Sequence, residues 1–299
     1  FLQAGIVQAD GLIRLTIPKQ LKEYLKKLGN GANFIYLKAK PLSNTTIRQL
    51  RVKLHGKGKL QLIAVYEKEL PDILEDNGRC LSIDLGIRNT FTCYSSVSSS
   101  AFIIKGYLEL HQGYDKLIAH YQSINASQQA AAGIRYPKAS KRVHSLYEKK
   151  SHAIRDFIHK ATTKIRDYCV QNQIHTVVIG DITGIRKGKS LGRKNNQPFH
   201  AFPYRMIYQM LEYKLALCGI RFVKQNEAYS SQCAPTSKEV GKQYANKYRR
   251  CKRGLYNDGG IIYNADAVGA YNILRLYLQS IKKEAPVFRD LSTVKKVTV

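Results

Sequence analysis

The sequence has few acidic residues and no long apolar run. Asp and Glu total 21 against 49 Lys and Arg, which gives a formal net charge of +28 at pH 7. Such an excess of positive charge repels itself unless a polyanion neutralises it, and nucleic acid is the partner that this composition indicates. Because neither a long apolar run nor an amphipathic basic anchor is present, we expect no membrane partner.

Cysteine is also sparse. The six cysteines are widely spaced, and several lie in apolar stretches where a small buried thiol is normal, so a disulfide scaffold is not expected.

No signal-peptide pattern is present, which predicts a cytoplasmic protein. The chain enters a strand-like run directly at Phe1, so we expect the front region to be incomplete at its N-terminus. Its 299 residues suffice for one large domain or two smaller ones.

The front of the chain, residues 1–77, predicts a β-rich region that binds nucleic acid. Runs such as GLIRLTIP and NFIYLKAKP alternate apolar and polar residues, as strands do. The run HGKGK lies between two further alternating segments, like the turn of a hairpin. Lys and Arg stud the outer face of such a sheet, which suits phosphate contacts.

The rest of the chain alternates strands and helices. LSIDLGI, NTFTCYSSV and AFIIKGYLEL predict three sequential strands, followed by a flexible-looking stretch at 123–142. Apolar residues at helical spacing from Val143 to Tyr168 then predict a long amphipathic helix. The strand HTVVIGDITGI, a second helix, the strand GIRFVKQNEAY and a helix in NADAVGAYNILRLYL complete the order. This order predicts an α/β, ribonuclease H-like fold, in which acids at strand ends and at the last helix converge.

Two acids stand at such positions. Asp84 ends an apolar strand and precedes a Gly turn, so its carboxylate should lie at the carboxyl edge of the central strand. Taken alone, it could equally be a turn Asp. Asp266 stands just before a helix rich in small residues, where a simple N-cap is as good an interpretation. The pair favours a catalytic site more than either residue does alone.

Four motifs carry a resemblance to a known family. SIDLGIRNT, IGDITGIRKG, AYSSQC and DAVGAYNIL resemble the TnpB family, the transposon-encoded OrfB-type proteins related to type V CRISPR effector nucleases. The resemblance extends from the front region to about Leu278 and implies a RuvC-like nuclease domain at 78–230 and 257–281 behind a wedge-type domain. It further implies a prokaryotic, nucleoid-associated protein that binds a guide RNA from the transposon end and cuts double-stranded target DNA. Asp84 and Asp266 would be the first and third catalytic acids.

The second acid departs from the family pattern. The family has a Glu followed by Asp at a strand end, where this sequence has Gly180 and Asp181. Adjacent residues of a strand point to opposite faces, so Asp181 replaces the Glu only if the strand end is twisted or bulged. Glu227 ends the next strand, about 5 Å away, and Gly180 would leave space for it. We predict Asp84, Glu227 and Asp266 as catalytic and metal-binding residues, with Asp181 as the alternative second acid.

Such a cluster of acids indicates a divalent metal. Clustered carboxylates repel one another and raise their own pKa values unless a cation holds them ionised, so we expect Mg²⁺ or Mn²⁺. Two ions would activate water and stabilise the leaving 3′-oxygen in phosphodiester hydrolysis.

A second departure concerns zinc. Many relatives carry a zinc ribbon with two Cys-x-x-Cys knuckles before the third acid, and here these have decayed to Cys233-Ala-Pro-Thr236 and Cys251-Lys-Arg-Gly254. A structural zinc site needs four ligands, whereas the segment between Gln225 and Asp266 holds two Cys and no His. We therefore expect no structural zinc in this insert, residues 231–256, and only a tail at 282–299.

Two basic segments are predicted to contact nucleic acid. The insert interleaves Lys and Arg with tyrosines, which suits phosphate neutralisation and base stacking, and a second basic loop follows the second strand motif. The predicted contact residues are Arg186, Lys187, Lys189, Arg193, Lys194, Lys242, Lys247, Arg249, Arg250, Lys252 and Arg253.

The leading functional hypothesis is an RNA-guided, metal-dependent DNA endonuclease of a transposon. Because the expected Glu is absent at position 180, a nuclease-dead RNA-guided protein that acts by occupying DNA is an alternative. A DNA-strand transferase is a third class, although no catalytic Tyr stands near a His-hydrophobe-His motif.

Overall fold

The computed structural model describes residues 1–9, 12–38, 46–55, 59–183, 198–252 and 254–299. The chain forms two compact units, Phe1–Leu70 and Pro71–Val299, each with its own core. Residues 71–77, which the sequence assigns to the front region, therefore fall in the second unit. In the described part of the chain, no helix is long and apolar enough to cross a membrane.

The first unit is built from short antiparallel strands. Alternation in its second strand turns Ile13 and Leu15 inward and leaves Leu12 exposed. The two inward residues form a small core with Ile47 and Leu50. A three-stranded sheet, β1-β2-β3, and a hairpin, β4-β5, result. The elements are η1 (Gln3–Gly5), β1 (Ile6–Ala9), β2 (Leu12–Thr16), α1 (Lys19–Lys27), β3 (Phe34–Lys38), β4 (Ile47–His55) and β5 (Lys59–Tyr66).

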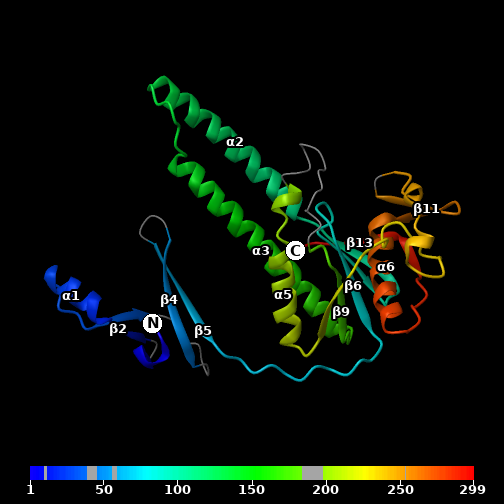
Figure 1. The fold of residues 1–299 in the computed structure, drawn as a ribbon, viewed down its shortest axis with the longest axis horizontal. Helices are drawn as coiled ribbons and strands as arrows, with labels where there is room; N and C mark the ends of the chain where they lie inside the picture. The colour runs from blue at the N-terminus through cyan, green and yellow to red at the C-terminus, as the bar shows by residue number, and fades with distance from the viewer. Residues whose placement is uncertain (10–11, 39–45, 56–58, 184–197, 253) are drawn as a thin grey trace. The chain divides into compact units, whose positions relative to one another are not determined.

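The second unit is organised around a six-stranded mixed sheet (Figure 1). The first three strands form an antiparallel meander, and β9 and β10 extend it parallel to β6. The strand order is β10-β9-β6-β7-β8-β13. The strands are β6 (Cys80–Leu85), β7 (Phe91–Ser95), β8 (Ser100–Ile104), β9 (Thr176–Gly180), β10 (Arg221–Gln225) and β13 (Asp290–Val297).

Helices cover both faces of this sheet. Leu81 and Ile83 of β6 pack toward α3 and α5, whereas Cys80 on the same strand packs toward α6. This division follows from the period of two along a strand. The first face is closed by large aliphatic side chains, and the second by the small residues of α6. The helices are α2 (Tyr107–Ala131), α3 (Lys141–Gln171), α5 (Tyr204–Ala216) and α6 (Ala265–Ser280).

Two segments differ from the sequence expectation. The predicted strand AFIIKGYLEL ends at Ile104, and a helix, α2, begins at Tyr107 and continues into the first part of the stretch expected to be flexible, as far as Ala131. The change of direction occurs at Gly106, whose φ of 147° suits only glycine and whose added Cβ would collide with Phe157. The expected tail at 282–299 instead contributes β13, which pairs parallel to β8 at the sheet edge.

The insert before α6 is compact. Two short 3-10 turns, η2 (Lys242–Tyr244) and η3 (Lys247–Arg249), precede an antiparallel hairpin of β11 (Leu255–Asp258) and β12 (Ile261–Asn264).

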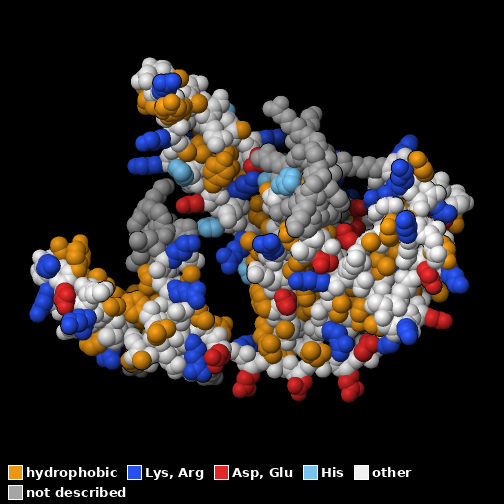
Figure 2. All heavy atoms as spheres, in the orientation of Figure 1, with side chains coloured by type: hydrophobic (Ala, Val, Ile, Leu, Met, Phe, Trp, Pro, Cys, Tyr) orange, Lys and Arg blue, Asp and Glu red, His pale blue; other side chains and the backbone are white. Residues whose placement is uncertain are grey.

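Figure 2 shows Lys and Arg side chains scattered over both units on the face in view. Both units therefore present positive charge on this face.

Candidate active site

Asp84 lies on the α6 face of the central sheet, near the carboxyl end of β6. The register pairs Ile83 with Ile179 of β9, so Asp84 and Gly180 are lateral neighbours on the same face. Asp84 packs against Gly269 of α6, where an added Cβ would lie 2.7 Å from its Oδ2 atom. The helix can approach this carboxylate because residue 269 has no side chain.

Glu227 fills the space beside Gly180. Gln225, the last residue of β10, pairs with Gly180, and Glu227 follows two residues later. A Cβ added to Gly180 would collide with the Glu227 carboxylate. The acid from the neighbouring strand end therefore occupies the volume into which a side chain at position 180 would project.

Asp266 lies in the first turn of α6 without capping it. The N-cap is Asn264, whose Oδ1 accepts hydrogen bonds from the backbone N–H groups of Asp266 and Ala267, both at 3.1 Å. The Asp266 carboxylate instead accepts a 2.6 Å hydrogen bond from Asn89 Nδ2 and lies 3.5 Å from the Arg250 guanidinium. The simple N-cap interpretation of Asp266 is therefore wrong, because Asn264 performs that role.

The three carboxylates influence one another electrostatically. Burial, followed by the negative charges of Glu227 and Asp266, raises the pKa of Asp84 well above its usual range. Arg250 acts in the opposite direction and lowers the pKa of Asp84. As the side chains stand in the described residues, no group of three or more His, Cys, Asp or Glu is arranged to hold a metal ion.

Asp181 is oriented differently. Its backbone N–H donates to the Gln225 carbonyl at 2.8 Å, which continues the strand ladder by one residue. Alternation then directs its side chain away from the face of Asp84, and its Oδ1 accepts from the Thr183 N–H at 2.8 Å. Tyr208 stabilises the same strand end through two hydrogen bonds. Its hydroxyl donates to the Gly180 carbonyl and accepts from the Ile182 N–H, each at 2.9 Å.

Two known protein families match parts of the chain. The OrfB_IS605 family, described as a probable transposase, matches residues 63–186, and the Cas12f1-like TNB domain matches residues 204–273. These two matches confirm the resemblance to the TnpB family that the four sequence motifs carry. No curated protein matches this TnpB-like chain.

Solved structures agree on the fold. A Cas12f1–sgRNA–target DNA complex matches with a TM-score of 0.57 at 18% identity, over 87% of this chain and 52% of that one. A CRISPR-Cas12f ternary complex matches with a TM-score of 0.50 at 17% identity, over 90% of this chain and 60% of that one. The TnpB-like chain thus spans little more than half the length of these proteins. The predicted α/β fold with a RuvC-like domain behind a preceding domain is confirmed.

Helix α6 of the TnpB-like chain also anchors the segment that follows Glu227. The buried Asn272 donates from Nδ2 to the carbonyls of Ser230 and Cys233, at 2.8 and 2.9 Å. Arg275, also buried, donates to the Ala234 carbonyl and to the Asn272 side chain, both at 3.0 Å. In the sequence analysis, Asn272 was only one letter of the DAVGAYNIL motif and had no role of its own. A polar pair at positions i and i+3 of an otherwise apolar helix is the signal that was missed.

Polar contacts also organise the insert. Asp258 accepts from Thr236 Oγ1 at 2.5 Å and forms an ion pair with Arg249. The two cysteines have different surroundings, because Cys233 is buried with its thiol donating to the Gly241 carbonyl at 3.3 Å, whereas Cys251 is exposed.

The predicted nucleic-acid contacts divide into three groups. Lys242, Lys247 and Lys252 are exposed on the insert. Arg249 is bound to Asp258, and Arg250 lies beside Asp266. The remaining predicted contact residues lie outside the described residues: Arg186, Lys187, Lys189, Arg193, Lys194 and Arg253.

Proposed function

We propose that this chain is an RNA-guided, divalent-metal-dependent endonuclease that hydrolyses phosphodiester bonds in target DNA. The observation that carries the proposal is the position of the Glu227 carboxylate beside Gly180, on the sheet face that also holds Asp84. The resemblance to the TnpB family, with the OrfB_IS605 match over residues 63–186, supports the nuclease class. RNA guidance is supported by the Cas12f1 relative, which is described as a complex with sgRNA and target DNA.

The donor set fits a hard divalent cation such as Mg²⁺ or Mn²⁺. Asp84, Glu227 and Asp266 offer only carboxylate oxygens, the ligands that these ions prefer. A cation among them would offset the burial and the repulsion that together raise the pKa of Asp84, and would hold the three groups ionised at neutral pH. Asp266 would exchange its present contact with Arg250 for the metal.

Each residue then has a distinct task. When bound, the metal supplies activation of water and stabilisation of the leaving 3′-oxygen. Gly180 and Gly269 keep the space in which the Glu227 and Asp84 carboxylates lie. Arg250, once released from Asp266, can pair with a phosphate of the substrate. The exposed Lys242, Lys247 and Lys252 neutralise the neighbouring backbone.

The partners follow from the same surface. A chain with a net charge of +28 needs a polyanion, and the proposed partners are a guide RNA derived from the transposon end and the double-stranded target DNA. The β-rich first unit, with its exposed basic strands, is the proposed wedge-type contact to RNA and duplex DNA.

Cleavage of a guide-matched plasmid in Mg²⁺ tests the proposal. We expect wild type and Asp181→Asn to cut and Glu227→Gln to lose cutting, because only Glu227 lies on the face of Asp84. A metal-binding readout that does not depend on activity is Mn²⁺ titration calorimetry, in which Glu227→Gln should bind more weakly than Asp181→Asn.

The opposite outcomes are equally informative. If Asp181→Asn is inactive while Glu227→Gln cuts, the second acid is Asp181. A wild-type protein that binds guide RNA and matched DNA but never cuts is an RNA-guided binder that acts by occupancy.

A further inference from the structure

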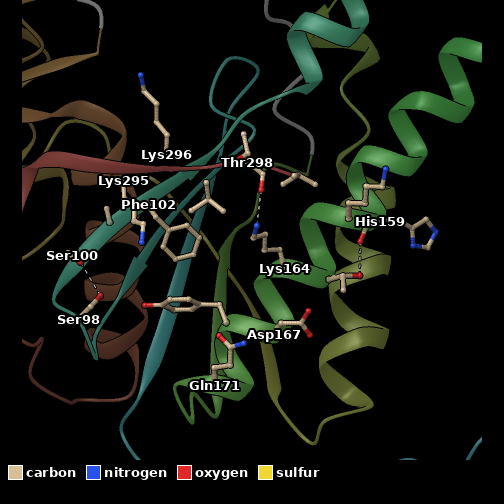
Figure 3. Close-up of a pocket in the computed structure, with 16 residues that line it drawn as sticks. Ser98, Ser100, Phe102, His159, Lys164, Asp167, Gln171, Lys295, Lys296 and Thr298 are labelled. Atoms are coloured by element: carbon tan, nitrogen blue, oxygen red, sulfur yellow. Dashed lines mark hydrogen bonds between the residues drawn. The ribbon is translucent and has the colours of Figure 1, made fainter.

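A large groove lies on the other face of the central sheet, between α3 and the outer strands β8 and β13 (Figure 3). Its volume is about 1070 Å³, at the upper end of the roughly 300–1,000 Å³ typical of small-molecule sites. Phe102 of β8 lies in its wall, and the Lys164 side chain reaches across from α3 to donate to the Thr298 carbonyl at 2.9 Å.

The charge of the groove favours an anion. Four of its lining residues are lysines, two from α3 and two from β13: Lys160, Lys164, Lys295 and Lys296. Within the described residues, neither lysine of β13 has an acidic side chain within ion-pair distance, whereas Lys160 pairs with Asp156 on its own helix. Lys295 and Lys296 are adjacent on β13, so only Lys295, which pairs in register with Phe102, faces the groove. Together with Lys160 and Lys164 it forms a set of three cations that a phosphate backbone complements.

The remaining lining suits nucleotides. The rings of Phe102 on β8 and Tyr168 on α3 meet between the two sides of the groove, with centroids 4.9 Å apart, and provide an aromatic surface for a base. Ser98, Ser100 and Gln171 add hydrogen-bonding groups. This mixture of cations, rings and amide or hydroxyl groups is typical of single-strand binding surfaces, where bases are unpaired and accessible.

One lining residue favours RNA over DNA. Asp167 lies among the lysines, and its carboxylate, which pairs with Arg166, retains capacity to accept further hydrogen bonds. A ribose 2′-hydroxyl can donate to a carboxylate, whereas DNA lacks this donor and would bring only phosphate charges near it. An acid within a phosphate-binding groove is therefore compatible with RNA and unfavourable for DNA.

The groove is separated from the acids by the sheet. Phe102 packs in the same core as α3, whereas Asp84 lies on the face covered by α6. The strand β7 also separates β8 from β6, and the two lie about 10 Å apart. A strand bound in this groove is consequently not presented to the carboxylates.

We infer that this groove binds a single-stranded segment of RNA, with phosphates along Lys160, Lys164 and Lys295 and a base against Phe102 and Tyr168. The inference rests on the proposed function in one respect, because it gives the RNA partner a location on the second unit. Because the groove faces away from the acids, the RNA bound there would remain uncut.

Fluorescence anisotropy with a short labelled oligouridine and the matching oligodeoxyuridine tests the inference on the full chain. The groove variant is Lys160→Glu/Lys295→Glu. Its control is Lys116→Glu/Lys282→Glu, which changes the net charge equally at exposed lysines outside the groove. We expect the groove variant to weaken RNA binding more than the control and to reduce the slope of log K against log salt by about 1.4, since each single-strand phosphate contact contributes about 0.7.

Asp167→Ala tests the choice of RNA. It should raise the affinity for oligodeoxyuridine and lower the RNA-to-DNA preference, while the salt slope stays near that of wild type. Oligouridine carrying 4-thiouridine should cross-link to peptides of α3 or β13, which locates the RNA directly.

Equal loss in the groove variant and the control, or cross-links confined to other peptides, would overturn the inference. Equal affinity of wild type for the two oligomers would overturn the choice of RNA. None of these readouts needs cleavage, so a chain that binds RNA in the groove but cuts no DNA contradicts only the proposed endonuclease.

Discussion

The two faces of the central sheet have different compositions and different tasks. The α3 and α5 face is closed by large aliphatic side chains such as Ile158, Ile165 and Leu211, all fully buried. The α6 face is packed with alanines and glycine and contains the buried polar side chains of Ser82 and Asn272. Small residues bring α6 close to the strands and leave room for carboxylates, whereas the other face supplies most of the apolar burial. Most of the apolar burial and the proposed catalytic acids thus lie on opposite faces of the sheet.

The largest effect should come from a truncation on the aliphatic face. Ile165→Ala removes fully buried methyl groups, so the free energy of unfolding should fall by about 2–5 kcal/mol. Urea denaturation measures this loss, and Ile124→Ala, at an exposed position on α2, should stay within about 0.5 kcal/mol of wild type. A similar loss for both variants would mean that this face does not dominate stability.

A single methyl group on the α6 face should instead reduce activity. Gly180→Ala would displace the Glu227 carboxylate, and a misplacement of this kind should lower the cleavage rate about a hundredfold. The melting temperature should change little, because the far end of Glu227 can move. Gly241→Ala is the control, since a Cβ there meets nothing within 4 Å.

The same pair of positions offers a rescue. Glu227→Gly should be inactive, and adding Gly180→Glu should restore part of the cleavage by returning the acid to the strand end. The double variant could regain metal affinity and still be as inactive as Glu227→Gly. In that case cleavage requires a more exact position of the carboxylate than metal binding does.

A smaller effect is expected from the anchor on α6. Asn272→Leu keeps the volume but removes the donors to the Ser230 and Cys233 carbonyls, which should cost about 1–3 kcal/mol of unfolding free energy. Because this segment follows Glu227, the cleavage rate of the folded fraction should fall as well. Unchanged cleavage with reduced stability would assign Asn272 to stability alone.

The smallest effect concerns a buried cation on the aliphatic side. Burial lowers the pKa of Lys214 from 10.5 to about 8, although its ammonium donates to the His159 carbonyl and to Thr162 and Thr163. Between these two pH values the unfolded chain binds more protons at this group than the folded chain does, so stability should rise with pH. Lys214→Met should lack this rise in urea titrations across that range, whereas Lys282→Met, at an exposed position, should keep it.

The sequence was sufficient where strand alternation was decisive. LSIDLGI and HTVVIGD read correctly as neighbouring buried strands, and alternation alone separates Asp181 from the face of Asp84. It was insufficient for α2, where Asn, Ser, Gln and Ala suggested flexibility although Leu110, Tyr114 and Ile118 recur at helical spacing. It also missed β13, because a short Lys-rich strand at a sheet edge has little apolar signal.

The polar framework around the acids was the least predictable part. Contacts such as Asn89 with Asp266 and Asn272 with Ser230 join residues far apart in the chain, and no local sequence pattern predicts them. Propensity and periodicity describe neighbours along one element, whereas these bonds depend on how separate elements meet.

Position 180 and position 227 compete for one volume. A side chain at position 180 excludes the carboxylate of residue 227 from this space. The second acid can therefore stand at position 180 or at position 227, but not at both. Among chains of this fold, the two states should be mutually exclusive, and a sequence with acids at both positions should keep Glu227 outside the cluster. The glycine therefore serves as a marker: where it stands at the end of this strand, the missing acid should be sought just beyond the next strand.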